Sequence, residues 1–351
     1  IYTLSLHDAL PIWSAQRAEA RGRRRIMSNS ANSYQALRNT AAAYRRGDAI
    51  LRITGTDRRT LGMRLLARSI EYAAVNTAVD SLLLDDDGSA IGTALAIQRD
   101  TDIVMMVDAP RTWIDIVRRE ARTLDVELNI ENQIALAVEG PLSWKAAQAV
   151  LEDRPVEDVL LGDAVTCQIG GAEVVVARAG TIAEYGYVMI GDEGRIRDAV
   201  SPVLAELGDE ADPQALRRAR IESNYPVLPE QVRGADVLEA GIGWCMTLSR
   251  EDGFIGSRVR DLPDPSRRVV AAYFDGACPE EGTSVLDTGE RVGVVLVPAA
   301  DCGQKSLALL LLDNPYGVPG LELESGTGTC RTVSRPTIAP VSWAQAIGAE
   351  Q

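Results

Sequence analysis

The spacing of apolar and polar positions predicts an α/β unit at the start of the chain. Residues 49–54 alternate as in a strand, and leucines 61, 65 and 66 have the spacing of a helix over residues 57–69. The other elements expected in this unit are a helix over 33–46, strands over 79–84, 94–99 and 103–107, and a helix over 112–123.

A second unit with the same composition of elements follows. Its expected elements are strands over 127–130 and 134–139, a helix over 143–151, strands over 164–169, 172–177 and 187–190, and a helix over 194–206. Two such units predict an α+β fold with paired ferredoxin-like lobes.

After residue 261 the elements predicted from the sequence are strands. A helix is expected over 213–221, and the Pro- and Asp-rich stretch 262–267 is a candidate hinge. Strands over 268–273, 293–297 and 307–312, with Gly and Pro between them, predict a small antiparallel β-barrel or a sandwich. We therefore expect a region of two lobes over 27–261 and a C-terminal β-barrel domain over 262–351.

The first residues resemble translated sequencing-adapter sequence, and we expect residues 1–26 to be an upstream artefact. The single histidine, His7, falls there. Catalytic triads, Cys-His pairs and His-ligated metals are therefore excluded, and no metal site is expected. Proton chemistry would have to use carboxylates, tyrosines, lysines or cysteines.

Charge and cysteine usage narrow the class of protein further. The net charge is −14, which opposes binding to nucleic acid or to an anionic membrane, and no apolar run has the length of a membrane span. Five scattered cysteines without CxxC spacing indicate a reducing, cytoplasmic setting, in which Cys245 is buried rather than reactive. The sequence leaves the oligomeric state open.

The stretch 177–187 carries the most informative chemistry. It follows a β-rich run and places Glu184 between small residues and two tyrosines. Such a carboxylate can accept a pair of N–H donors from a flat heterocycle. Taken alone, however, the stretch favours a hairpin corner with a solvated glutamate.

Six short motifs, taken in their order along the chain, instead favour a ligand-binding role for Glu184. They are Ile53-Thr54-Gly55-Thr56-Asp57, Glu139-Gly140-Pro141, the Arg178–Tyr187 stretch, Arg220-Ile221-Glu222, Glu239-Ala240-Gly241-Ile242-Gly243-Trp244 and Phe254-Ile255-Gly256. Together they resemble the glycine-cleavage T-protein family, the aminomethyltransferase superfamily that includes tetrahydrofolate-dependent demethylases. The resemblance implies three domains around a central folate pocket.

The resemblance also implies a set of folate-binding residues. Glu184 would hold the N–H edge of the pterin, and the remaining pocket residues would be Tyr187, Arg178, Arg220, Asp108 and Asp80. Arg178 either meets the folate glutamate tail or braces its loop, and bracing is favoured. A structural ion pair between Arg220 and Glu222 is an equal alternative to a pocket role, and Trp244 fits a core position better than a pocket wall.

The chain departs from the family where the family carries its catalytic aspartate. That position holds Gly92, followed by Thr93, and the turn Asp85-Asp86-Asp87 before it is interpreted as solvated. The catalytic residue is therefore unknown. Methyl transfer from a small, already activated donor to tetrahydrofolate depends mainly on positioning and tolerates this loss. A cationic donor would be held by Asp80, Asp108 or the face of Trp113.

We therefore expect a demethylase-like, tetrahydrofolate-dependent one-carbon transferase with a small-molecule donor and without a lipoyl carrier protein. Two alternatives stay open. One is an aminomethyltransferase that uses other catalytic residues, and the other is a non-catalytic folate-binding or sensor protein, or the folate-binding partner of an oxidase.

Overall fold

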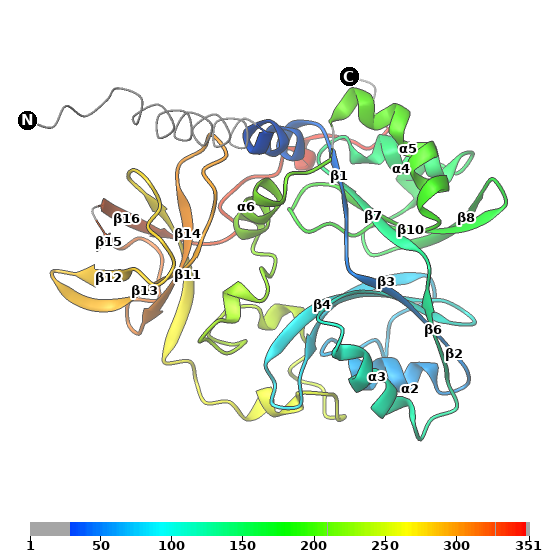
Figure 1. The fold of residues 1–351 in the computed structure, drawn as a ribbon, viewed down its shortest axis with the longest axis horizontal. Coiled ribbons are helices and arrows are strands. Elements are labelled where there is room, and N and C mark those ends of the chain that lie inside the picture. The colour runs from blue at the N-terminus through cyan, green and yellow to red at the C-terminus, as the bar shows by residue number, and fades with distance from the viewer. Residues whose placement is uncertain (1–28, 209, 327, 349–351) are drawn as a thin grey trace, which may run out of the picture.

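The computed structural model describes residues 29–208, 210–326 and 328–348. The expected artefact at 1–26, with His7, lies outside these residues. Three separate sheets surround the centre of the molecule, and each belongs to a different unit (Figure 1). The α+β class with a C-terminal antiparallel barrel is thus confirmed.

The first lobe is a five-stranded sheet with two helices on one face. Its strands, in spatial order, are β3 (Thr77–Leu84), β4 (Ala90–Gln98), β5 (Ile103–Asp108), β2 (Ala49–Thr54) and β6 (Glu127–Glu131). Helices α2 (Arg58–Leu65) and α3 (Trp113–Ala121) pack on this sheet through a core that includes Leu61, Leu65 and Trp113. Trp113 is 1% exposed, so the expectation that its face holds a cationic donor is wrong.

The second lobe repeats this plan. Its sheet has the order β1 (Ala42–Arg45), β7 (Ile134–Glu139), β10 (Gly186–Gly191), β9 (Ala172–Ala177) and β8 (Ala164–Ile169), with α4 (Ser143–Leu151) and α5 (Glu193–Leu207) on its outer face (Figure 1). The inner faces of the two lobe sheets share one core, in which Leu95 and Met106 of the first lobe meet Ala137 and Val188 of the second.

The helix expected over 33–46 is only partly correct. Residues 29–39 are helical, and 42–45 form β1, which pairs with β7 in the register Ala42↔Glu139. The alternation decides the strand, because Ala42 and Tyr44 enter the core between the lobes while Ala41 and Ala43 enter the core under α4 and α5. A strand buried on both faces leaves no polar face that local sequence could reveal.

The C-terminal unit is a closed barrel of six antiparallel strands. Around the barrel they run β11 (Arg267–Phe274), β14 (Leu307–Asp313), β13 (Glu290–Pro298), β12 (Ser284–Asp287), β15 (Glu322–Ser325) and β16 (Gly328–Val333). Three of them were predicted, and closure removes the sandwich alternative. The strands that the pattern missed include the short β12 and β15, which carry exposed polar residues such as Glu322 and Glu324.

Helix α6 (Pro213–Ser223) lies between the barrel and the lobes (Figure 1). It begins at an Asp212 cap whose carboxylate accepts the N–H groups of Gln214 and Ala215, and it ends at Asn224 in the left-handed region (φ 68°). No described helix is long and apolar enough to cross a membrane.

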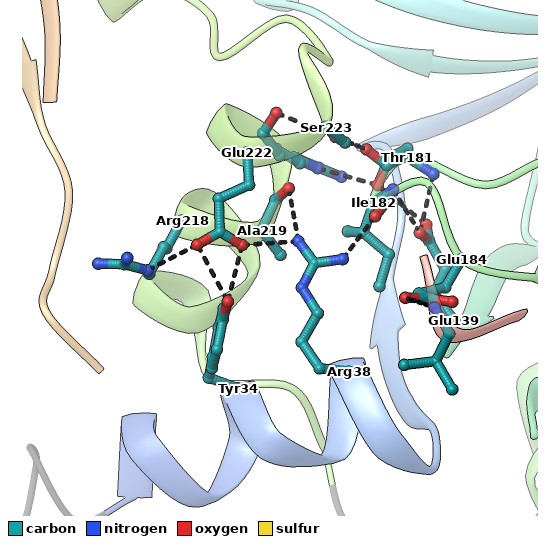
Figure 2. Close-up of polar contacts among 12 residues, drawn as sticks. Tyr34, Arg38, Glu139, Thr181, Ile182, Glu184, Arg218, Ala219, Glu222 and Ser223 are labelled. Atoms are coloured by element: carbon teal, nitrogen blue, oxygen red, sulfur yellow. Dashed lines mark hydrogen bonds and ion pairs between the residues drawn. The ribbon is translucent and has the colours of Figure 1, made fainter. Parts of the chain in front are cut away.

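A buried carboxylate on α6 joins several segments. Glu222, 1% exposed, accepts hydrogen bonds from the Tyr34 hydroxyl (2.9 Å), Arg38 Nη2 (2.8 Å) and Arg218 Nε (3.0 Å), as Figure 2 shows. Arg38 also donates to the carbonyl of Ile182, and Arg218 donates to the carbonyls of Ala300, Asp301 and Lys305. The N-terminal helix, the second lobe and the barrel therefore all meet at α6.

We expect Glu222→Gln to lower the free energy of unfolding by about 3–5 kcal/mol, because it leaves two guanidinium groups without their buried counter-charge. Urea unfolding followed by circular dichroism measures this change. The control is Glu193→Gln, which breaks the exposed Arg197–Glu193 pair and is expected to cost less than about 1 kcal/mol. Equal effects from the two substitutions would contradict the role given to Glu222.

Candidate functional site

The stretch 178–187 comprises the connection between β9 and β10 and the first two residues of β10, and its carboxylate is already engaged by the protein. Glu184 is 7% exposed, and its two oxygens accept the backbone N–H groups of Val341 (3.0 Å) and Ser342 (2.9 Å). These donors start a short 3-10 helix, η5 (Val341–Ala344), after the barrel. The hydroxyl of neighbouring Tyr185 donates to the carbonyl of Gln345 (2.6 Å), so this stretch anchors the C-terminal segment.

Other residues of the stretch are also engaged in packing. Tyr187 is fully buried in the second-lobe core, and burial raises the pKa of its hydroxyl to about 12. Arg178 donates to the carbonyl of Val159 (3.0 Å), and its guanidinium lies 5.2 Å from the ring centre of Tyr185. These contacts correspond to the bracing role favoured for Arg178.

A second buried carboxylate binds the loop that precedes Glu184 (Figure 2). Glu139, 0% exposed, accepts the N–H groups of Thr181 (2.8 Å) and Ile182 (3.0 Å) and the hydroxyls of Thr181 and Tyr44. This carboxylate fixes the loop that precedes Glu184. With its hydrogen-bonding capacity used in this way, Glu139 is a structural residue.

Two cavities lie between the units, and Tyr225 lines both of them. The first, which we call the Asp80 cavity, has a volume of about 550 Å³ and is lined by Asp80, Arg178, Trp244 and Tyr72 among others. The second, which we call the Asp108 cavity, has a volume of about 470 Å³. Its lining includes Asp48, Gly92, Thr93, Asp108 and Arg220.

The wall between the cavities is a buried polar cluster. The Tyr225 hydroxyl donates to Asp80 Oδ1 (3.1 Å) and accepts from Arg46 Nη2 (2.8 Å), and the same Nη2 forms an ion pair with Asp80. Burial raises the pKa of Tyr225 far above its usual value. Burial opposes the charge of Arg46, but the facing Tyr225 and Asp80 raise its pKa. Tyr225 therefore stays protonated and Arg46 stays charged.

Arg220 supports this wall from α6. Its guanidinium lies 5.4 Å from the ring centre of Tyr44 and 5.6 Å from that of Tyr225, and it donates to the hydroxyls of Thr181 and Tyr44. The alternative of an Arg220–Glu222 ion pair is wrong, because residues two apart on a helix point in different directions. Glu222 pairs with Arg38 and Arg218 instead.

Gly92 has no room for a side chain. A Cβ atom added there would lie 2.3 Å from the carbonyl oxygen of Asp108 and 2.5 Å from Cβ of Ala109. Asp108 itself is exposed and lies opposite Thr93 in the β4–β5 pair. A carboxylate cannot replace Gly92 without moving the end of β5.

Three smaller expectations can be compared with the structure. Cys245 is 2% exposed, and burial raises its pKa to about 12, as expected for an unreactive thiol. The turn Asp85-Asp86-Asp87 is solvated as predicted, and Asp85 accepts the N–H groups of Asp87 and Ser89. Trp244 is 45% exposed and lines the Asp80 cavity, so its assignment to the core is wrong.

Four of the six site residues predicted from the sequence line a cavity, and two do not. Asp80 and Arg178 line one cavity, and Asp108 and Arg220 line the other. Glu184 and Tyr187 line neither cavity. Arg46 and Asp48 were missed, because Arg46 ends a stretch expected to be helical and Asp48 lies in the short gap before the next expected strand. Among the described residues, no group of three His, Cys, Asp or Glu side chains could hold a metal ion.

Comparison with known proteins shows which family and which relatives the chain is similar to. The GCVT N-terminal domain family matches residues 16–250. The aminomethyltransferase of Lysinibacillus sphaericus is 22% identical over 315 residues, 85% of each chain. That of Rubrobacter xylanophilus is 26% identical over 260 residues, 69% of this chain and 67% of the relative.

The fold is shared with a solved structure. Glycine cleavage system aminomethyltransferase T from Bartonella henselae superposes with a TM-score of 0.75 at 15% identity, over 88% of this chain and 89% of that one. These findings confirm the resemblance drawn from the six motifs. Because the family match spans more than half of the sequence, the chain belongs to the GCVT N-terminal domain family.

Proposed function

We propose that the protein is a tetrahydrofolate-dependent one-carbon transferase, in which the Asp80 cavity holds the folate and the Asp108 cavity holds the donor. The observation that carries this proposal is the pair of cavities that share Tyr225 as a wall. Because both cavities border Tyr225, substrates bound in them would lie next to the same side chain, and transfer would require them to meet at its edge. The aminomethyltransferase relatives support the same general chemistry.

The Asp80 cavity suits each part of a folate. Asp80 Oδ2 accepts no hydrogen bond among the described residues and can take an N–H group of a pterin. Trp244 and Tyr225 offer aromatic surface to flat rings. Arg68 and Arg178 line the same cavity and can attract the carboxylates of a folate tail.

The Asp108 cavity favours a donor that needs positioning rather than acid–base help. Bound tetrahydrofolate would supply N5 as the acceptor of a methyl group, the donor heteroatom would keep the electrons of the broken bond, and the proton of N5 would leave to solvent. Asp48 and Asp108 form no ion pair within the described part of the chain, so both can attract a cationic donor. With Gly92 at the family's catalytic position, nothing there protonates an amine leaving group.

Aminomethyl transfer is the second candidate, and the family comparison fits it equally well. The observation that keeps it is the presence of the Asp48 and Asp108 carboxylates in the same cavity as Gly92. In this variant, one of them would take over the role of the missing aspartate. The products differ, since methyl transfer yields 5-methyltetrahydrofolate and aminomethyl transfer yields the 5,10-methylene form.

We expect turnover of a small sulfonium or quaternary ammonium methyl donor to give 5-methyltetrahydrofolate, detected by liquid chromatography and mass spectrometry. Asp108→Asn should raise the KM of the donor about fivefold, which corresponds to about 1 kcal/mol for an exposed charge, without changing the Kd of tetrahydrofolate. The exposed Asp115→Asn is the matched control. An aminomethyl donor is tested in parallel; turnover of that donor alone, with the 5,10-methylene product, would favour aminomethyl transfer, and folate binding without turnover of either kind of donor would favour a sensor.

The role of Glu184 is open to a separate measurement. Because its oxygens hold Val341 and Ser342, we expect Glu184→Gln to lower the free energy of unfolding by about 1–3 kcal/mol and to leave the Kd of tetrahydrofolate unchanged. Urea unfolding and titration calorimetry give the two values. A large loss of folate affinity at unchanged stability would instead assign the pterin to Glu184, as the family resemblance implies.

A further inference from the structure

The Asp108 cavity is lined by charged side chains of both signs. Asp48 and Asp108 supply two carboxylates, and Arg217 and Arg220 of α6 supply two guanidinium groups. Among the described residues, no ion pair joins one of these aspartates to one of these arginines. Opposite charges that line one cavity without neutralising each other can both be used by a ligand.

The two carboxylates lie at neighbouring strand ends. Asp108 is the last residue of β5, and Asp48 directly precedes β2 and donates its N–H group to the carbonyl of Val107 (2.7 Å). The register Ala49↔Val107 puts Asp48 beside Asp108. Both side chains are exposed, and neither accepts a hydrogen bond within the described part of the chain. Because like charges repel each other, a cation with several N–H donors stabilises this pair.

The two arginines are neighbours on α6, since residues three apart lie on the same side of a helix. The one ion pair of Arg217 within the described ranges is a long contact of 3.8 Å with Glu230. Arg220 forms no ion pair with a described residue, and its hydrogen bonds to the hydroxyls of Thr181 and Tyr44 are both 3.3 Å long. Both guanidinium groups can therefore bind a carboxylate, which matches their planar N–H pattern.

We propose that the Asp108 cavity binds the headgroup of an α-amino acid, with its ammonium at Asp48 and Asp108 and its carboxylate at Arg217 and Arg220. The inference rests on the proposed function and narrows the donor to an α-amino acid with a methylated sulfonium side chain. In the transfer, the methyl–sulfur bond breaks and the methyl–N5 bond forms. Sulfur keeps the electron pair as a thioether, and the proton of N5 leaves to solvent.

The balance of charge favours a zwitterionic headgroup. An isolated cation is attracted by the two carboxylates but repelled by the two guanidinium groups, and an isolated anion meets the reverse situation. An ammonium and a carboxylate on one carbon atom satisfy both sets at once. Arg217 and Asp48 are then specificity-determining residues, one for each end of the headgroup.

A headgroup with N–H donors fits this cavity better than a fully methylated cation does. A methylated cation has no N–H group for the carboxylates and binds best against aromatic faces. Among the described residues, Tyr225 is the one aromatic side chain that lines the cavity. Its ring centre already lies 5.7 Å from the guanidinium of Arg46 and 5.6 Å from that of Arg220. The apolar part of the lining, which includes Ile91 and Leu216, can contact the side chain of an amino acid.

Calorimetric titration of the full-length protein with S-methylmethionine, its N-acetyl derivative and its carboxamide tests the headgroup. Each derivative removes one of the two charges of the headgroup and keeps the sulfonium. We expect S-methylmethionine to bind at least about tenfold more tightly than either derivative, as for the loss of one hydrogen-bonded charge. Equal affinity for the three compounds, or no binding of any of them, overturns the proposal.

Two substitutions distinguish the two ends of the site. Arg217→Gln should abolish the preference for the carboxylate over the carboxamide and retain the preference for the free amine, and Asp48→Asn should do the reverse. The matched control, Arg118→Gln on the exposed side of α3, should retain both preferences. If both preferences survive both substitutions, the assignment is wrong. Circular dichroism checks the fold of each variant, and the comparison of the three compounds with the wild-type protein needs no variant.

Methyl transfer separates this inference from the proposed function. A kcat/KM for S-methylmethionine at least about tenfold above that for trimethylsulfonium, with 5-methyltetrahydrofolate as the product, supports both. Equal values for the two donors overturn the headgroup site and leave the proposed function standing. The expected order of dissociation constants without methyl transfer from either donor supports the headgroup site and overturns the methyl-transfer function.

Discussion

The structure depends on buried carboxylates that are matched by donors from distant segments. Glu139, Glu184 and Glu222 are at most 7% exposed, and each accepts at least two hydrogen bonds (Figure 2). A carboxylate removed from water is tolerated only when such donors replace its hydration. Because these donors come from the N-terminal helix, the second lobe and the segment after the barrel, the requirement fixes how the units sit against one another. The cavities between the units are a consequence of that arrangement.

The carboxylates that line the two cavities are less completely hydrogen-bonded than these three buried carboxylates. Asp80 keeps one free oxygen, and Asp48 and Asp108 are exposed carboxylates, so these groups can still respond to a ligand. Arg46 is as buried as the structural arginines and, like Arg38, keeps one buried guanidinium nitrogen without a partner among the described residues.

Sequence alone predicts the parts of this fold that have clear local patterns. Strands β7, β8 and β9 and helix α4 have the predicted bounds, because alternation or helical spacing and a flanking Gly or Pro define each of them. Strand β1 was missed because Ala41–Tyr44 is apolar on both faces and its partner β7 is about ninety residues away. The partners of Glu184 lie still further along the chain, at 341 and 342, so its motif could indicate a paired acceptor but could not identify the donors.

Matched motifs and departures from the expected family pattern are distributed differently in the molecule. The matched Glu184 and Glu222 are buried where the units meet, whereas the matched Arg178, Arg220 and Trp244 line the cavities. The departures, which are Asp80, Gly92, Thr93 and Asp108, lie on neighbouring strands β3, β4 and β5, and every one of them lines a cavity. The motifs identify the family, but they do not select the donor. On the proposed function, the position of Gly92, which has no room for a carboxylate, bears more directly on the donor than the Glu184 loop, because the oxygens of Glu184 are already engaged by Val341 and Ser342.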